Sequence, residues 1–173
     1  MKKILYLFLV LPLLFSSCAK EEGCTDSQAT NYNSDAEEDD GTCTYDITGV
    51  WTTTSAMLNG VEQLGGLIDT DLTYIWDNGD LGAEGYKSGV MVNYSIGTAV
   101  LTAGDPNVLV WSGDVYADQT QPNLSVPLSL TVNIDKLTNA NNMTWRYVNY
   151  PTTSDTYVKT LVRCTTCSLN DWK

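Results

Sequence analysis

Five cysteines and a series of acidic and amide side chains are the groups in this sequence that could support chemistry. Cys164 and Cys167 have two residues between them, a spacing that occurs in thiol oxidoreductases and in zinc sites. Oxygen ligands of the kind that calcium prefers are offered by Asp26, Asn31, Asn33, Asp35, Asp39 and Asp40. The sequence contains no histidine, which excludes Ser/His/Asp and Cys/His catalysis and histidine-bound zinc or haem.

The Cys164–Cys167 pair favours a structural role over a redox one. Thiol oxidoreductases carry this motif at the start of a helix after a strand, whereas here it follows a predicted final strand close to the C-terminus. Two thiolates also supply only half of a zinc site. We therefore expect a disulfide that fixes the C-terminal tail, residues 166–173. The acidic residues lie mostly in predicted turns, so we expect no enzyme, and a carboxylate-based hydrolase is the least favoured alternative.

The N-terminus predicts export and lipid attachment. Two lysines precede an apolar run, Ile4 to Phe15, that is too short to span a bilayer. The stretch Leu14-Phe15-Ser16-Ser17-Cys18 resembles the bacterial lipobox, which implies a signal peptide over residues 1–17 and an acylated Cys18 at the start of a tether, residues 18–23. An ordinary secretory signal is the alternative. Ala19-Lys20-Glu21-Glu22 resembles a signal for the outer face of the outer membrane, so we expect a lipid-anchored, surface-exposed location and the membrane as a partner.

Residues 24–45 form an acidic unit, of which residues 24–43 resemble a cysteine-bounded motif found near the ends of secreted bacterial proteins. Its loop is too polar to fold by burial alone, and export places Cys24 and Cys43 in an oxidising compartment. We therefore expect these two cysteines to pair, which is the most local of the three connectivities that four cysteines allow. Calcium is the only cofactor that the sequence suggests. The alternative is that this loop is a solvated acidic spacer that binds no metal.

From Tyr45 onward, strand-forming residues alternate with turn formers. Leu128 to Ile134 alternates apolar and polar side chains without exception, as expected for a strand between a dry interior and water. Further strands are predicted over Gly49 to Met57, Leu72 to Trp76, Tyr86 to Tyr94, Val108 to Tyr116, Met143 to Tyr150, Thr156 to Cys164 and, shorter, Ile96 to Leu101. About eight strands joined by short turns predict an all-β domain over residues 46–165, an up-and-down antiparallel β-barrel, with a β-sandwich as the alternative.

The stretch ITGVWTTTSAMLNGVE resembles the first strand of the lipocalin-like domains of bacterial lipoproteins. SLTVNIDKLTNANNMTWRY and TYVKTLVRC resemble the late hairpin and closing strand of that family. The resemblance implies a barrel whose closed end is filled by Trp51, with an arginine stacked on the indole. Arg163 suits this role best, and Arg146 is the alternative. The central motif and the C-terminal helix of larger lipocalins are not found.

The resemblance also implies a barrel interior that holds a small apolar molecule. Strand faces that could line such a pocket carry Tyr74, Trp76, Trp111, Trp145 and Tyr147. The alternative is that these aromatic residues fill a solid core, so that the protein acts through its surface on a protein or glycan. A net charge of −12 disfavours nucleic acid as a partner, and we expect a monomer.

Overall fold

The structure is a computed structural model that describes residues 20–102, 105–117, 125–150 and 154–172. Of residues 101–102, 105–107 and 135–138 it describes the backbone alone. The predicted signal peptide and Cys18 lie outside the described residues. The chain divides into two compact units, one containing residues 31–43 and the segment before residue 28, and one containing residues 28–30 and 44–173.

The smaller unit is held by a disulfide and short turns. Strands β1 (Glu22–Gly23) and β2 (Glu38–Asp39) form a two-residue parallel pair. The predicted disulfide between Cys24 and Cys43 is present next to this pair, and Cys24 is buried. Because the rest of the loop exposes most of its side chains, this covalent link is its main constraint.

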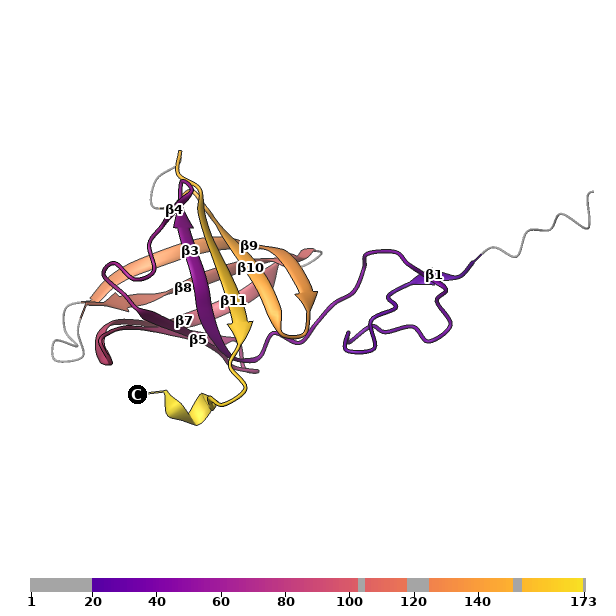
Figure 1. Cartoon of the computed structure of the whole chain (residues 1–173), viewed down its shortest axis with the longest axis horizontal. Helices are drawn as coiled ribbons and strands as arrows, with labels where there is room; N and C mark the ends of the chain where they lie inside the picture. Colours follow the sequence, from indigo (N-terminus) through magenta and orange to yellow (C-terminus); the bar gives the residue numbers. More distant parts are fainter. Residues whose placement is uncertain (1–19, 103–104, 118–124, 151–153, 173) are drawn as a thin grey trace, which may run out of the picture. The chain divides into compact units, whose positions relative to one another are not determined.

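The larger unit is a closed antiparallel barrel, as predicted (Figure 1). Its strands, in chain order, are β3 (Gly49–Leu58), β5 (Thr70–Ile75), β6 (Asp80–Lys87), β7 (Val90–Thr102), β8 (Asp105–Tyr116), β9 (Ser125–Asn139), β10 (Asn142–Val148) and β11 (Tyr157–Arg163). Each pairs with the next along the chain, and β11 returns to pair with β3. A short strand, β4 (Val61–Glu62), forms a hairpin with the end of β3. The sandwich alternative is therefore wrong.

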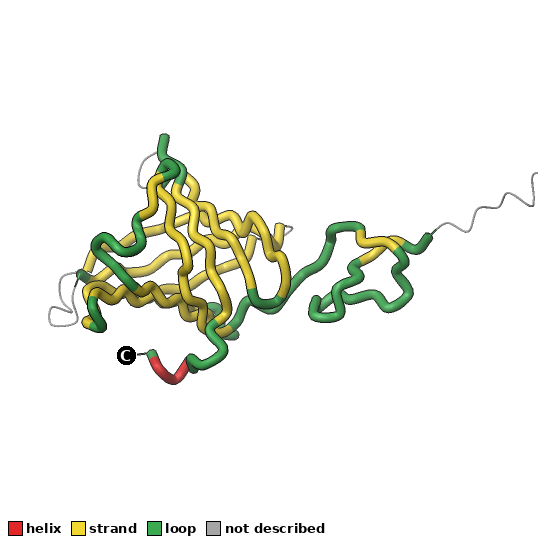
Figure 2. The backbone as a smooth tube through the Cα atoms, viewed as in Figure 1, coloured by secondary structure: helices red, strands yellow, loops and turns green. Residues whose placement is uncertain are grey.

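Period-two alternation directs apolar side chains into this tube, whose curving strands are shown in Figure 2. Along β9, Leu128 and Leu130 line the interior and Val132 is buried, whereas the residues between them are polar. Two glycines permit a tight approach of β7 and β8. Gly97 pairs with Gly113, and a Cβ on Gly113 would lie 2.6 Å from Cζ2 of Trp111. This pair therefore makes room for the indole of Trp111 inside the barrel.

One predicted strand is wrong. Residues 86–94 do not form a single strand, because a turn at Ser88 and Gly89 separates β6 from β7. Both residues have positive φ, 52° and 78°, which a strand does not accommodate. The short strand predicted over residues 96–101 is instead part of the long strand β7.

The C-terminal tail packs against the outside of the barrel. Cys164 and Cys167 form the predicted disulfide directly after β11, and a 3-10 helix, η2 (Leu169–Asp171), follows (Figure 2). Trp172 then makes edge contacts with Tyr74 and Trp76, with ring centroids 5.1 and 5.5 Å away. In the part of the chain described here, no helix has the length and apolar character needed to cross a membrane.

Candidate functional site

One end of the barrel is closed by Trp51 and Arg163, as predicted. Trp51 is fully buried, and its indole N–H donates to the carbonyl of Ile47 at 2.9 Å. The guanidinium carbon of Arg163 lies 4.4 Å from the centre of the indole ring. The same guanidinium donates to the carbonyls of Asp46, Thr48 and Ala140, so it ties the chain before β3 to the β9–β10 turn. Arg146, the alternative, is exposed on β10.

The interior of the barrel contains a cavity of about 540 Å³. Its apolar wall is formed by side chains from β6, β8, β9 and β10, namely Leu81, Leu109, Trp111, Val132 and Trp145. All five are buried members of one hydrophobic cluster that also contains Trp51. The cavity therefore lies against the closed end, and its volume is within the range of small-molecule sites, roughly 300–1,000 Å³.

A buried ion pair interrupts this apolar lining. Lys159 of β11 donates to Oδ2 of Asp71 of β5, and Thr53 of β3 donates to the same oxygen at 3.1 Å. The two charged side chains are only 12% and 10% exposed. Burial alone would lower the pKa of Lys159, but the attraction and hydrogen bond of Asp71, together with the neighbouring Tyr147 and Tyr157, outweigh burial and raise the pKa above its ordinary value. The ammonium therefore stays charged at neutral pH.

Three tyrosines lie beside the ion pair. Tyr147, Tyr150 and Tyr157 line the cavity, and their ring centroids are 5.1 to 6.0 Å apart. Burial raises the pKa of Tyr147 to about 12 and also raises the pKa of Tyr157. Both hydroxyl groups therefore remain protonated, and hence able to donate hydrogen bonds, at neutral pH.

Trp145 carries a buried donor without an acceptor. Its ring lines the cavity and it is 3% exposed, yet its indole N–H has no hydrogen-bond partner among the described residues. Buried polar groups are nearly always paired, and leaving one unpaired costs about 1–3 kcal/mol. The interior thus retains unused hydrogen-bonding capacity.

The loop between β4 and β5 forms part of the cavity wall near the end of β3 and the start of β11. Leu64, Leu67 and Ile68 line the cavity, and Leu67 is 88% exposed, which places this loop at the mouth. The carboxylate of Glu62 holds the loop by accepting the backbone N–H groups of Ala56, Gln63 and Leu64. These hydrogen bonds, above all that from Ala56, lower the pKa of Glu62 to about 2.

The five predicted pocket residues divide into two groups. Trp111, Trp145 and Tyr147 line the cavity, as predicted. Tyr74 and Trp76 do not, and this part of the prediction is wrong. Along β5 the residues that face inward are Asp71 and Thr73, so Tyr74 points outward by alternation.

On that outer face, Glu84 accepts hydrogen bonds from two tyrosines. Tyr74 and Tyr86 each donate a hydroxyl hydrogen bond to its carboxylate, which is 0% exposed. Trp76 stacks on Tyr74 with ring centroids 5.8 Å apart, and Trp172 covers both rings. The C-terminal tail therefore packs on this aromatic cluster through Trp172.

The sequence analysis missed the polar residues of the cavity. Asp71, Lys159 and Thr53 are on inward-facing positions of three strands that meet through β3. The signal was present in the alternation of β11, where Tyr157, Lys159 and Leu161 share one face. A lysine on an otherwise apolar face indicates a buried charge that needs a partner.

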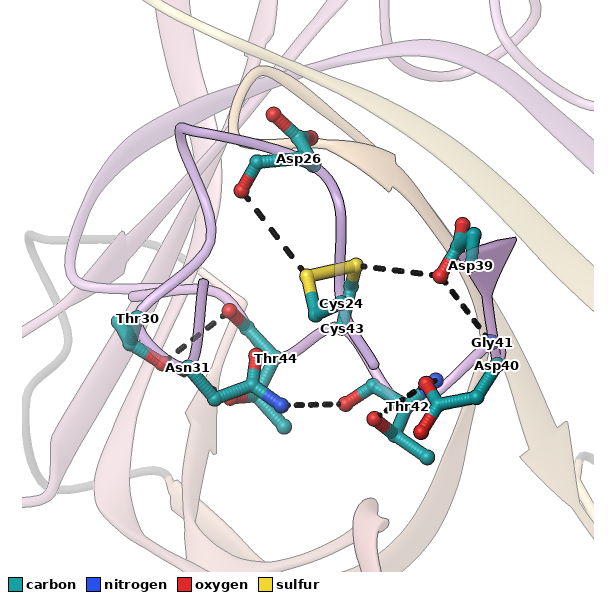
Figure 3. Close-up of a disulfide and its surroundings, with 10 residues drawn as sticks. All are labelled: Cys24, Asp26, Thr30, Asn31, Asp39, Asp40, Gly41, Thr42, Cys43 and Thr44. Atoms are coloured by element: carbon teal, nitrogen blue, oxygen red, sulfur yellow. Dashed lines mark hydrogen bonds between the residues drawn. A yellow bond between two sulfur atoms is a disulfide. The ribbon is translucent and has the colours of Figure 1, made fainter. Parts of the chain in front are cut away.

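Of the predicted calcium ligands, Figure 3 draws Asp26, Asn31, Asp39 and Asp40, and the last three are engaged in hydrogen bonds within the loop. Asp39 and Asp40 accept backbone N–H groups of Gly41 and Thr42, and the amide of Asn31 donates to the carbonyl of Thr42. The side-chain oxygen of Asn33, another predicted ligand, accepts the backbone N–H of Asp35 at 3.0 Å. Within the described residues, no three cysteine or acidic side chains are grouped to hold a metal.

Comparisons with known proteins add little to this geometry. No protein family model matches the chain, and no curated protein sequence matches it. A search of solved structures finds a chain from a crystal structure of an LTBP1 LTC4 complex. It is 10% identical, with a TM-score of 0.48, over 70% of this chain and 68% of that chain. A likeness at this level supports no argument about function.

Proposed function

We propose that this protein is a lipid-anchored, lipocalin-like binding protein whose barrel accepts a small, largely apolar molecule. The observation that carries the proposal is the cavity of about 540 Å³ inside the barrel, lined by Trp111, Trp145 and aliphatic side chains. A barrel that served only as a scaffold would fill this space with side chains, because protein interiors pack densely. The Trp51–Arg163 pair closes one end, so a ligand enters at the other.

The alternative of a solid barrel that acts through surface aromatic residues is less well supported. That function would need Trp76, Trp111 and Trp145 together on one exposed patch, whereas Trp111 and Trp145 are only 4% and 3% exposed. The hydrolase alternative would need a free acid at the cavity, and both acids in the described part of its lining are engaged. Asp71 is paired with Lys159, and Glu62 is bound by backbone N–H groups of its loop.

Binding can be tested with N-phenyl-1-naphthylamine, a neutral apolar dye whose fluorescence rises in dry surroundings. The chain from residue 20 onward, secreted so that both disulfides form, contains both folded units and needs no detergent. We expect a saturable rise in dye fluorescence with about one site per chain. Absence of saturable binding would refute the proposal.

Two matched substitutions locate the bound dye. Ala83 of β6 lines the cavity, so Ala83→Phe should fill it and weaken dye binding at least tenfold. Val110 of β8 is 38% exposed on the outside, so Val110→Phe adds a ring there and should leave affinity within twofold. Equal weakening by the two variants would place the dye outside the barrel.

The anchor rests on the sequence motif at Cys18 and has its own test. We expect the full chain to incorporate an alkyne-labelled palmitate and to fractionate with the outer membrane, and Cys18→Ala to do neither. Digestion of whole cells with a protease would show whether the barrel is on the cell surface.

A further inference from the structure

The electrostatics of the cavity select the charge of its ligand. Among the residues that line it, the charged ones are Glu62, Asp71 and Lys159. Glu62 lies at the mouth with its carboxylate bound by backbone N–H groups, whereas Asp71 and Lys159 lie inside and neutralise each other. No unbalanced charge therefore faces the deeper part of the cavity from the described lining.

The polar and apolar parts of the lining occupy different depths. Along β11 the inward residues run from Tyr157, which pairs with Leu58 near the mouth, through Lys159 to Leu161, and Arg163 then pairs with Trp51 at the closed end. The ion pair therefore lies nearer the mouth than the indole of Trp51. Below it lies the apolar wall formed by Leu81, Leu109, Trp111, Val132 and Trp145.

Some donor and acceptor atoms of the ion pair make no hydrogen bond within the described residues. Thr53 and Lys159 both donate to Oδ2 of Asp71, and its Oδ1 has no partner among the described residues. The ammonium of Lys159 has three N–H groups and donates one to Asp71. The hydroxyls of Tyr147 and Tyr157 likewise have no hydrogen-bond partner within the described part of the chain.

A charged ligand head would upset this balance. An anion drawn to Lys159 would also meet Asp71, and a cation drawn to Asp71 would meet Lys159, so either would lose its hydration without a free counter-charge. A hydroxyl or primary amide can instead accept from Lys159 and donate to Asp71 Oδ1. Such a group satisfies both positions at a much smaller desolvation cost.

We infer that the ligand is an uncharged amphiphile, with an apolar body against Trp111 and Trp145 and a hydroxyl or amide group at the Asp71–Lys159 pair. This inference rests on the proposed function, since it names the ligand class of the same cavity. The ion pair is then the element of the cavity that distinguishes a neutral head from a charged one.

The test uses three amphiphiles, each with an unbranched ten-carbon chain, that carry different head groups: 1-decanol, decanoate and decyltrimethylammonium. Each competes with N-phenyl-1-naphthylamine for the wild-type chain, at concentrations below micelle formation. We expect 1-decanol to displace the dye at a concentration at least tenfold lower than either ion. Equal potency of the three, or stronger binding of an ion, would overturn the inference while leaving the proposed function intact. Failure of the dye itself to bind would refute the proposed function instead.

Single substitutions in the pair should reverse the preference. Asp71→Asn leaves Lys159 as an unpaired cation and should improve decanoate at least tenfold relative to 1-decanol. Lys159→Gln leaves Asp71 and should favour decyltrimethylammonium in the same way. The matched control is Asp114→Asn, which makes the same chemical change on a β8 residue that does not line the cavity, and it should change nothing. Folded variants that keep the wild-type order would overturn the inference, and if a variant does not fold, the wild-type comparison decides alone.

Discussion

Replacement of Arg163 by alanine should be among the most destabilising changes on the surface of the barrel. The guanidinium stacks on Trp51 at 4.4 Å and donates to the carbonyls of Asp46, Thr48 and Ala140. The stacking contributes about 0.5–2 kcal/mol, and each hydrogen bond from a charged donor about 1.5–3 kcal/mol. Because the three hydrogen bonds share one group and are partly exposed, their contributions do not add in full.

We therefore expect Arg163→Ala to lower the free energy of unfolding by about 4 kcal/mol, a large part of the roughly 5–15 kcal/mol that stabilises a domain. Arg163→Lys keeps the charge but loses the planar fork that reaches three carbonyls, so it should lose about 2–3 kcal/mol. Equilibrium unfolding in urea, followed by tryptophan fluorescence and circular dichroism, measures both losses.

The matched control is Arg146→Ala, which removes the same charge from an exposed position on β10. It should change the free energy of unfolding by less than about 0.5 kcal/mol. A loss below 1 kcal/mol for Arg163→Ala, or equal losses for the two variants, would refute the assignment of Arg163 as the group that closes the barrel.

Three further predictions concern other parts of the chain. The pKa of Glu62 is lowered from 4.5 to about 2, so its carboxylate stabilises the mouth loop fully above pH 4.5, and this stabilisation is lost as the pH falls towards 2. Amide hydrogen exchange of the loop should show this loss. Glu62→Gln should lower the exchange protection of the loop already at pH 6. A Cβ on Gly82 would lie 2.5 Å from the Trp172 ring, so Gly82→Ala should lower the free energy of unfolding in urea by about 1–3 kcal/mol. In a Trp172→Ala background the same substitution should cost much less. Equal losses in the two backgrounds would contradict the packing of Trp172 on Gly82. Cys24→Ser with Cys43→Ser should make the small unit sensitive to protease while the Tm of the barrel stays unchanged, and a drop in that Tm would show that the two units are coupled.

The strands of the barrel could be predicted because local signals determine them. The strict alternation over residues 128–134 fixes which face of β9 is apolar, and the structure has Val132 and Ile134 buried there. The motif around Trp51 and the arginine near the last strand are separated by more than a hundred residues in sequence. Their contact was predictable only from resemblance to a family, since no periodicity connects them.

The cavity lining was harder to predict because it depends on which face of each strand points inward and on which strands are neighbours in the barrel. Tyr74 and Trp76 were assigned to the pocket by residue type, but a shift of one position along a strand moves a side chain to the opposite face. The partnership of Asp71 with Lys159 arises because β5 and β11 both flank β3. Such a pairing becomes visible only when the order of the strands around the barrel is known.

The pairing of β3 with β11 also governs how the chain reaches its native state. The Thr54 side chain, near the start of the barrel, bonds to the carbonyl of Thr160, 106 residues later. A chain synthesised from its N-terminus must therefore keep one edge of β3 unpaired until the last strand is available. Contacts of such high sequence separation fold slowly, and an unpaired edge invites association with other chains. Until β11 pairs with it, β3 is therefore an exposed edge that a chaperone would protect by covering it.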